Sequence, residues 1–327
     1  MSNCQLTFSN IISILWFFSK CGILVPNNLT GTLPLELGHL IDVESIGFEN
    51  QVGLRGSLPS SIGSMINLGS ISILFAGPDF GGEIPDSLFN IPNLKHVSFQ
   101  YNTGVWSFSE LLKSDNILSP LLSLVIKSCG LSGTLPGFIS KFKSIKEIVF
   151  EGNSLQGSIP SLFGDLTSIE YINAYNNQLS GTLPKALGSL SNATTIVLGK
   201  NEFHGSIPSS LGNLGKLRLL DLSYNKLEGS IPSSLSGLVG LEHISLQQNN
   251  LSGSIAVFAH LEHLSSLILA SNEFNGSIPS GLFSNPTGNI FADFARNNFV
   301  GELPQNFAQI AAKKNISELM RFDFFLW

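Results

Sequence analysis

Hydrophobic and polar residues alternate in short stretches along this chain, and the stretches return at a regular distance. The segment LRLLDLSYN at residues 217–225 follows the frame L-x-x-L-x-L-x-x-N, which is repeated in LEHISLQQN at residues 241–249 and in LSSLILASN at residues 264–272. The apolar, polar, apolar order within each frame has the period of two that is typical of a strand with one buried face. The pattern therefore predicts one short strand in each copy.

A turn sequence, G-x-[LI]-P, follows each frame. Its first residues are Gly31, Gly56, Gly82, Gly133, Gly157, Gly181, Gly205, Gly229, Gly276 and Gly301, with a variant at Gly253. Neighbouring copies lie 23 to 26 residues apart, except for a gap of 51 residues after Gly82. In this gap the strand at residues 94–102 is intact, whereas we expect its turn, TGVWSF at residues 103–108, to be lost. With this hidden copy, the sequence predicts 12 units.

Repetition at this period predicts an elongated stack of coils and not a compact globule. Strands about 4.8 Å apart would form a parallel sheet of about 12 strands, roughly 55 Å long. Glycine tolerates unusual backbone angles and proline ends strand pairing, so G-x-I-P directs the chain to the convex side. There, turns such as SSLGNL at residues 209–214 are expected to bury Leu211 and Leu214.

An asparagine ends nearly every frame, at positions 102, 153, 177, 201, 225, 249, 272 and 297. At this point the chain leaves the strand, so backbone donors and acceptors lose their partners in the sheet. An amide side chain offers both functions. We therefore expect the asparagines to bridge neighbouring turns, which is a structural role and not a binding role.

The full frame, L-x-x-L-x-L-x-x-N-x-L-x-G-x-I-P, resembles the plant-type leucine-rich repeat, which is known from the extracellular portions of receptor-like kinases and receptor-like proteins and from polygalacturonase-inhibiting proteins. The resemblance covers about residues 24–307. It implies an α/β solenoid, a leucine-rich repeat superhelix of about 12 repeats. A parallel β-sheet would form its concave face, and short strands or 3-10 turns its convex face.

Both ends depart from the family pattern. WFFSKC at residues 16–21 keeps the Trp-to-Cys spacing of the family's N-terminal cap but lacks its Gly-Val, and the last residues contain no cysteine. We therefore expect an N-terminal segment at residues 1–22 that is an imperfect cap or a degraded signal, a solenoid at residues 23–310, and a tail at residues 311–327. From these departures we expect either a shortened family member or an incomplete gene sequence.

Charge and hydropathy argue against two classes of partner. Charged residues make up 12% of the chain and the formal net charge is −6, so there is little long-range attraction to nucleic acid or to an anionic membrane. The longest apolar run, IISILWFF at residues 11–18, is shorter than the roughly 20 residues that a membrane-spanning helix needs. We expect neither a nucleic-acid partner nor a membrane span within this chain.

Cysteines and sequons bear on the compartment. Cys129 stands where other copies carry asparagine, so we expect a small buried residue and not a reactive thiol. The pairing of Cys4 with Cys21 stays open. Sequons for N-glycosylation occur at Asn28, Asn192, Asn250, Asn275 and Asn315. The five sequons together favour an extracellular or cell-surface protein.

The exposed strand positions of successive units are expected to lie side by side on the concave face. Tyrosine and arginine are common in interface hot spots, and they gather with basic and amide groups between residues 171 and 247. The candidate ligand-binding residues are Tyr171, Tyr175, Lys200, Arg218, Asp221, Tyr224, His243 and Gln247. Ordinary solvated strand residues are the alternative, because any exposed strand face carries polar side chains.

Catalysis, cofactors and metals have little support. His243 and Asp221 have no aligned nucleophile and oxyanion site, and the H-x-x-H pair of His260 and His263 lacks a further ligand apart from Glu262. We expect no enzyme activity, no cofactor and no metal site.

Three functions remain open. The first is recognition of a protein or peptide ligand, a glycan or a partner ectodomain such as a co-receptor, in signalling or defence. The second is inhibition of a secreted hydrolase, as the resemblance to polygalacturonase inhibitors implies. The third is a structural or ice-associated scaffold, which the chemically mixed columns favour least.

Overall fold

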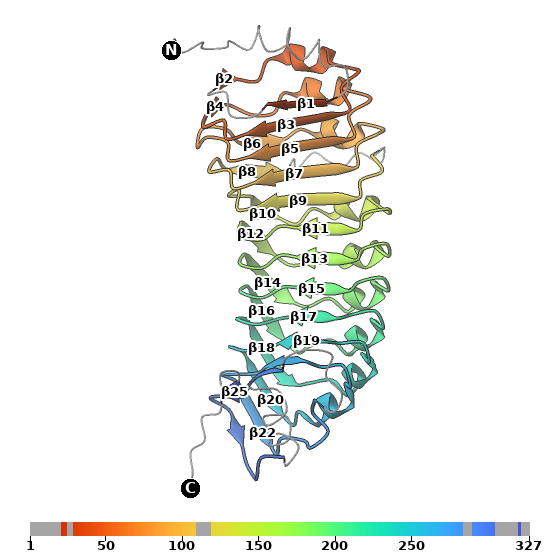
Figure 1. Ribbon diagram of the computed structural model, residues 1–327, viewed down its shortest axis with the longest axis vertical. Coiled ribbons are helices and arrows are strands. Elements are labelled where there is room, and N and C mark those ends of the chain that lie inside the picture. Colours follow the sequence, from red (N-terminus) through yellow and green to blue (C-terminus); the bar gives the residue numbers. More distant parts are fainter. Residues whose placement is uncertain (1–20, 25–28, 109–118, 284–289, 305–319, 322–327) are drawn as a thin grey trace. The chain divides into compact units, whose positions relative to one another are not determined.

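The computed structural model describes residues 21–24, 29–108, 119–283, 290–304 and 320–321. The chain divides into two compact units, Met1–Gln156 and Gly157–Trp327. In each unit the chain forms successive coils, and a typical coil contains a strand, a second short strand and a 3-10 turn (Figure 1). Within the described ranges, no helix is long and apolar enough to cross a bilayer.

In the first unit, one strand of each coil joins a parallel sheet in chain order. These strands are β1 (Cys21–Leu24), β3 (Ser45–Glu49), β5 (Ser70–Leu74), β7 (His96–Gln100), β9 (Ser123–Lys127) and β11 (Glu147–Val149). The register aligns Ile46 with Ile71, Ile71 with Val97, Val97 with Leu124 and Leu124 with Ile148. All five side chains are buried, so the strands share one apolar column.

The other elements of the first unit complete its coils. The second strands are β2 (Thr30–Thr32), β4 (Gly53–Arg55), β6 (Gly82–Ile84), β8 (Trp106–Phe108), β10 (Ser132–Thr134) and β12 (Ser154–Gly157). The 3-10 turns are η1 (Leu35–His39), η2 (Ser60–Ser64), η3 (Asp86–Asn90) and η4 (Gly137–Lys141).

The second unit repeats this plan. Its main sheet contains β13 (Tyr171–Asn173), β15 (Thr195–Val197), β17 (Leu219–Asp221), β19 (His243–Ser245), β21 (Ser266–Ile268), β23 (Phe291–Asp293) and β25 (Met320–Arg321). The last of these strands lies in the segment expected to be a tail, where it pairs Met320 with Ala292. Ile172, Ile196, Leu220, Ile244 and Leu267 form the buried column of this unit.

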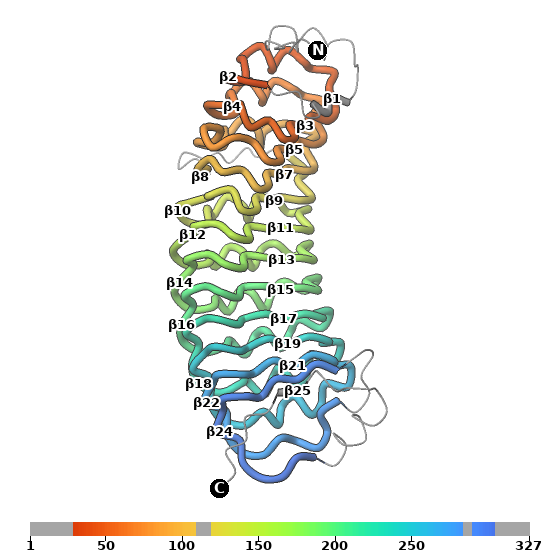
Figure 2. The backbone as a smooth tube through the Cα atoms, turned by 60° about the vertical axis from the view of Figure 1, so that its left-hand side comes forward, coloured from red at the N-terminus to blue at the C-terminus, as the bar shows by residue number. Residues whose placement is uncertain are grey.

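The second unit also contains a second row of short strands, of which Figure 2 labels β14, β16, β18, β22 and β24, and a set of 3-10 turns. The second strands are β14 (Gln178–Thr182), β16 (Glu202–Gly205), β18 (Lys226–Ser230), β20 (Asn250–Gly253), β22 (Glu273–Gly276) and β24 (Asn298–Phe299). The 3-10 turns are η5 (Ser161–Asp165), η6 (Lys185–Ser189), η7 (Ser209–Asn213), η8 (Ser233–Gly237) and η9 (Ala256–His260).

Proline and leucine together produce the 3-10 turns. Pro208 precedes η7 in an extended conformation, with φ −70° and ψ 133°. Its carbonyl accepts the Leu211 N–H at 3.1 Å, and the Leu211 carbonyl accepts the Leu214 N–H at 3.1 Å. This spacing of three residues turns both leucines inward, where they are buried as predicted.

The asparagine ladder is confirmed. The Asn201 side-chain NH₂ donates to the carbonyls of Ala174 in the preceding coil and of Leu198 in its own coil, at 2.9 and 3.1 Å. Its side-chain oxygen accepts the Leu179 N–H at 3.0 Å. Asn225 and Asn249 repeat this arrangement, as does Asn272 with the Leu251 N–H. Gln51 was not predicted to take part, but its longer amide accepts the Leu29 N–H at 3.0 Å.

The expected loss of the turn at residues 103–108 is wrong. Trp106–Phe108 forms β8, which aligns Trp106 with Gly82 of β6 and Ser107 with Ser132 of β10. Trp106 is completely buried, and its ring centroid lies 5.0 Å from that of Phe99 and 5.6 Å from that of Phe80. Burial of this large ring and pairing on both sides hold the strand without the G-x-I-P sequence.

Candidate ligand-binding surface

The exposed strand positions of the second unit form the predicted columns. The register aligns Tyr171 with Thr195, Thr195 with Leu219, and Leu219 with His243. Because side chains alternate across a strand, these residues lie on the face opposite the buried isoleucine and leucine column. We call this exposed side the strand face.

Three side chains converge on Gly199 at the end of one strand. A Cβ at this position would lie 2.8 Å from Ser223 Oγ, 2.9 Å from Asp221 Oδ1 and 3.1 Å from Tyr175 Cδ2. These separations are too short for an ordinary Cβ contact, so glycine leaves the space that the Tyr175 ring and the Asp221 carboxylate occupy. Gly199 therefore brings an aromatic ring, a carboxylate and a hydroxyl together on the strand face.

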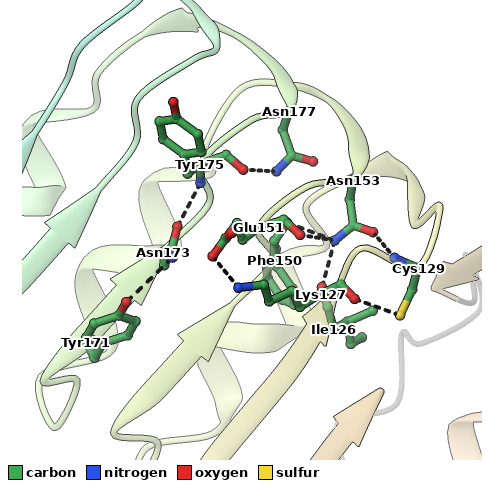
Figure 3. A network of polar contacts seen from close by, with 10 residues as sticks. All are labelled: Ile126, Lys127, Cys129, Phe150, Glu151, Asn153, Tyr171, Asn173, Tyr175 and Asn177. Carbon is green, nitrogen blue, oxygen red and sulfur yellow. Dashed lines mark hydrogen bonds and ion pairs between the residues drawn. The ribbon is translucent and has the colours of Figure 1, made fainter. Parts of the chain in front are cut away.

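Asp221 also supports its own loop. Its Oδ1 accepts the Ser223 N–H at 2.9 Å and the Ser223 hydroxyl at 2.6 Å. Asn173 and Asp293 accept the N–H of Tyr175 and Ala295, two residues further on, in the same way. Figure 3 shows Asn173 between Tyr171 and Tyr175, within 3.5 Å of the Tyr171 hydroxyl. The sequence analysis did not predict the turn that these side chains form at the end of each strand. The presence of Asp or Asn as the third residue of the strand was a signal for it.

The residue before each ladder asparagine has a left-handed backbone. In the second unit φ is 58° at Asn176, 54° at Lys200, 52° at Tyr224 and 57° at Gln248. The Lys200 and Tyr224 N–H groups donate to the next coil at 2.8 Å, which holds this conformation. Lys200 and Tyr224 are exposed, and Tyr224 retains 45% of its accessible surface. Their side chains are therefore available at the strand ends.

Arg218 lies near the starts of the strands. Its guanidinium forms an ion pair with Glu242 of the next coil, while 64% of the Arg218 side chain remains accessible. His243, which follows Glu242, is exposed, and Gln247 is half-buried. Of the eight predicted residues, Tyr171, Asp221 and His243 lie within strands on the strand face, whereas Arg218 precedes a strand and Tyr175, Lys200, Tyr224 and Gln247 follow one.

A charged pair in the first unit was absent from the sequence prediction. The Lys127 ammonium lies 3.0 Å from Glu151 (Figure 3). The pKa of Lys127 lies above its usual value of 10.5, because Glu151 accepts a hydrogen bond from the ammonium, although burial acts in the opposite direction. Lys127 is the last residue of β9 and aligns with Gln100, the last residue of β7. The alternation of apolar and polar residues along β9 was a signal in the sequence that the Lys127 side chain points away from the core.

Cys129 is buried, as predicted, and its thiol is free. Sγ lies 3.1 Å from the carbonyl oxygens of both Phe99 and Lys127. The backbone N–H of Cys129 donates to Asn153, which continues the ladder (Figure 3). Burial raises the pKa of this thiol.

The sequons differ in their surroundings. The Asn192 amide donates to the Thr167 carbonyl at 2.8 Å and accepts from the Lys216 ammonium at 2.7 Å. Asn250 and Asn275 are exposed on β20 and β22. Asn28, Asn315 and Cys4 lie outside the described residues, as does the side chain of Cys21.

The two histidines of the H-x-x-H pair, His260 and His263, are exposed at and just after the end of η9. In the described part of the chain, no group of three or more His, Cys, Asp or Glu side chains is placed to hold a metal ion. The arrangement of the strand face suits reversible contacts through rings, amides and charges.

The comparisons with known proteins point to one family. Models of the leucine-rich repeat match residues 168–190 and 191–251. No curated protein shows a significant match to the chain.

Several solved structures share the fold. The plant peptide hormone receptor RGFR1, in complex with RGF2, is 30% identical with a TM-score of 0.78, and the match covers 92% of this chain and 48% of the receptor. A TDR receptor is 27% identical with a TM-score of 0.82, over 98% of this chain and 55% of that one. The ectodomain of GASSHO1/SCHENGEN3 from Arabidopsis thaliana, in complex with CASPARIAN STRIP INTEGRITY FACTOR 2, is 27% identical with a TM-score of 0.58, over 93% and 43%. The chain therefore spans about half the length of these relatives.

Proposed function

Because this chain belongs to the plant-type leucine-rich repeat proteins, we propose that it is a non-catalytic module that recognises a peptide or a partner ectodomain through the strand face of its second unit. The similarity to the plant peptide hormone receptor RGFR1 in complex with RGF2, and to a membrane receptor kinase ectodomain in complex with CASPARIAN STRIP INTEGRITY FACTOR 2, supports this function. It also supports a place outside the cell or at the cell surface.

The observation that carries the proposal is the composition of the surface around Gly199. Tyr175, Asp221 and Ser223 converge there, and Lys200 and Tyr224 extend from the adjacent strand ends. Tyrosine supplies a large contact area with a polar end, and few of its torsion angles must be fixed on binding. A peptide in extended conformation that crosses several strands would contact successive residues of one column.

The first step of the test is to find a peptide that binds the chain. The immobilised full chain would be panned against a displayed library of random peptides, and the dissociation constant of a selected peptide would be measured. For the Tyr175→Ala, Tyr224→Ala double variant we expect a loss of about tenfold or more in affinity, as for hot-spot tyrosines. The circular dichroism spectrum should be unchanged.

Lys226→Ala is the matched control, because Lys226 is exposed on β18 and pairs with Glu202 away from the strand face. Equal affinities of the double variant, the control and the unmodified chain would exclude the strand face around Gly199. The alternative function, inhibition of a secreted hydrolase, has a separate test. If it holds, the full chain should lower the rate at which a purified polygalacturonase cleaves its substrate.

A further inference from the structure

Two exposed aromatic side chains in the first unit lie outside its core. Phe75 and Tyr101 directly follow β5 and β7, and they retain 44% and 40% of their accessible surface. Their rings are stacked, with centroids 5.3 Å apart and an interplanar angle of 16°. The Lys127 ammonium lies over the Tyr101 ring, 5.8 Å from its centroid. Since Phe75 and Lys127 come from the coils on either side, the accessible part of Tyr101 is the ring edge with its hydroxyl.

The backbone at these two positions does not favour aromatic residues. Phe75 has φ 54° and Tyr101 has φ 53°. Their N–H groups donate to the carbonyls of Gln100 and Lys127, which fixes the left-handed conformation. Glycine and asparagine adopt this conformation most easily, and bulky residues do so rarely.

The same chain uses the favoured residues elsewhere. Asn50, Gly152 and Asn176 occupy this position in three other coils, but Ser128, Lys200, Tyr224, Gln248, Ser271 and Arg296 occupy it in further coils. The backbone therefore does not require asparagine or glycine here, and what distinguishes Phe75 and Tyr101 is that two large rings stack on each other and remain exposed. Adjacent exposed aromatic rings indicate a surface for a contact outside the chain.

We infer that Phe75 and Tyr101 form a second binding site, in the first unit, that takes an aromatic side chain of an extended peptide. Ring edges carry a partial positive charge and favour the face of another aromatic ring. The two parallel rings lie close enough for one aromatic face to contact both edges. A sugar ring would instead need an open aromatic face, and those of Tyr101 are covered.

The neighbouring charges suit an uncharged ligand group. Lys127 is paired with Glu151 at 3.0 Å, so the site carries no unbalanced charge beside the rings. The pair still offers a donor and an acceptor to the peptide backbone. This site uses no residue of the second unit and therefore stands independently of the function proposed above.

The first test is thermal stability. Phe75→Asn and Tyr101→Asn should leave the melting temperature unchanged or raise it, because asparagine suits the left-handed backbone. Ser128→Asn is the matched control, since Ser128 occupies the same position in the next coil with φ 50°. A fall of more than about 5 °C in both aromatic variants, but not in the control, would mean that the stack is structural and would overturn the inference.

The second test is binding to the full chain by saturation-transfer difference NMR. The probes are acetyl-Gly-Gly-Trp-Gly-Gly-amide, the same peptide with leucine for tryptophan, and methyl β-glucoside. We expect the tryptophan peptide to bind about fivefold more tightly than the leucine peptide, as a preference for aromatic pairing predicts. The Phe75→Asn, Tyr101→Asn double variant should lose this preference.

Two variants should keep the preference for tryptophan: Ser128→Asn, and the Tyr175→Ala, Tyr224→Ala variant of the second unit. The inference fails if the double asparagine variant binds the tryptophan peptide as well as the unmodified chain does. It also fails if the leucine peptide or the glucoside binds equally well, or if no probe binds. None of these outcomes changes the conclusion about the strand face of the second unit.

Discussion

Gly199 is the single residue on which the candidate surface of the second unit depends most closely. Its missing Cβ leaves room for Tyr175, Asp221 and Ser223, all of which have side-chain atoms within 3.1 Å of the Cβ position. These neighbours are side chains and not backbone, so they can move. A methyl group here should therefore alter the surface more than the fold.

For Gly199→Ala we expect a loss of about 1 kcal/mol or less in unfolding free energy, because the neighbours can adjust. The affinity for the selected peptide should fall about tenfold, since the Tyr175 ring must move. Urea unfolding and a binding titration would check the two effects. Gly215→Ala is the control, because a Cβ there meets no atom within 4 Å. A similar change in affinity in both variants would contradict this role for Gly199.

Cys129 should be protected from alkylation in the folded chain. Its thiol is buried and its raised pKa reduces the thiolate, which is the reactive form. In a Cys4→Ser, Cys21→Ser background, iodoacetamide at pH 8 should modify Cys129 at least about a hundredfold more slowly in buffer than in urea. Mass spectrometry would follow the reaction. Equal rates in the two solvents would show that the thiol is accessible.

The Lys127–Glu151 pair predicts a dependence of stability on pH. The folded pKa of Lys127 is raised, so the pair stabilises the fold fully below the unfolded value of 10.5 and loses this effect as pH rises through the folded pKa. Both side chains are partly exposed, so the effect should be only about 0.5–1 kcal/mol. The difference in unfolding free energy between the unmodified chain and Lys127→Met should be constant from neutral pH to about pH 10 and shrink above 10.5. A difference that does not change with pH would contradict the pairing.

At the scale of elements, the asparagine ladder fastens each coil to the one before it. Asn225 accepts the Phe203 N–H and donates to carbonyls of two coils, and all of these groups are buried. Removal of the amide leaves one backbone donor and several backbone acceptors without their partner. Buried polar groups that lack partners are costly, so the ladder should contribute strongly to stability.

Asn225→Ala should lower the unfolding free energy by about 3 kcal/mol, the sum of several lost hydrogen bonds. Asn225→Asp should cost at least as much, because the carboxylate can still accept the Phe203 N–H but buries a charge and places its second oxygen against the Leu198 and Leu222 carbonyls. Asn213→Ala, at the exposed end of η7, is the control and should change stability by less than about 0.5 kcal/mol. Chemical denaturation would rank the three. Equal losses for Asn225→Ala and Asn213→Ala would exclude a role for the ladder.

Most elements could be predicted from sequence because each position of the repeated frame corresponds to a fixed place in the coil. Leu211, Leu214 and the asparagines occupy fixed places in the frame, and each was placed correctly. The strand β8 was missed because TGVWSF has no G-x-I-P, whereas pairing with β6 and β10 forms this strand. Neighbouring coils supply that information, and it is absent from the local sequence.

The candidate site could be predicted only in part. Strand alternation identified the exposed columns of the second unit, since it depends on period alone. It could not show that Gly199 makes room for Tyr175 and Asp221, because this depends on side-chain positions in three coils. The stack of Phe75 on Tyr101 was missed for the same reason, because the two residues come from different coils. The turn that Asp221 caps is local and had a signal in the sequence, which was overlooked.

At the scale of the whole chain, stability should follow nearest neighbours. Within each unit a coil bonds to the coils before and after it, so a local defect should spread only a short way. For Asn225→Ala we expect faster hydrogen exchange at the amides of β16, β17 and β18. Exchange in the first unit, at β5 and β7 for example, should be unchanged. Exchange that accelerates equally in both units would indicate a single cooperative structure.

The ladder also determines how such a chain can grow. The Asn201 side chain satisfies an N–H of the coil before it, and Asn225 does the same for the coil of Asn201. A tandem duplication of residues 201–224 would begin each copy with an asparagine and would therefore recreate these bonds at the new junction. An insertion of half that length would put a different residue at the asparagine position and leave an N–H of the preceding coil unsatisfied. We therefore expect this fold to lose less stability on duplication of a whole coil than on insertion of part of one.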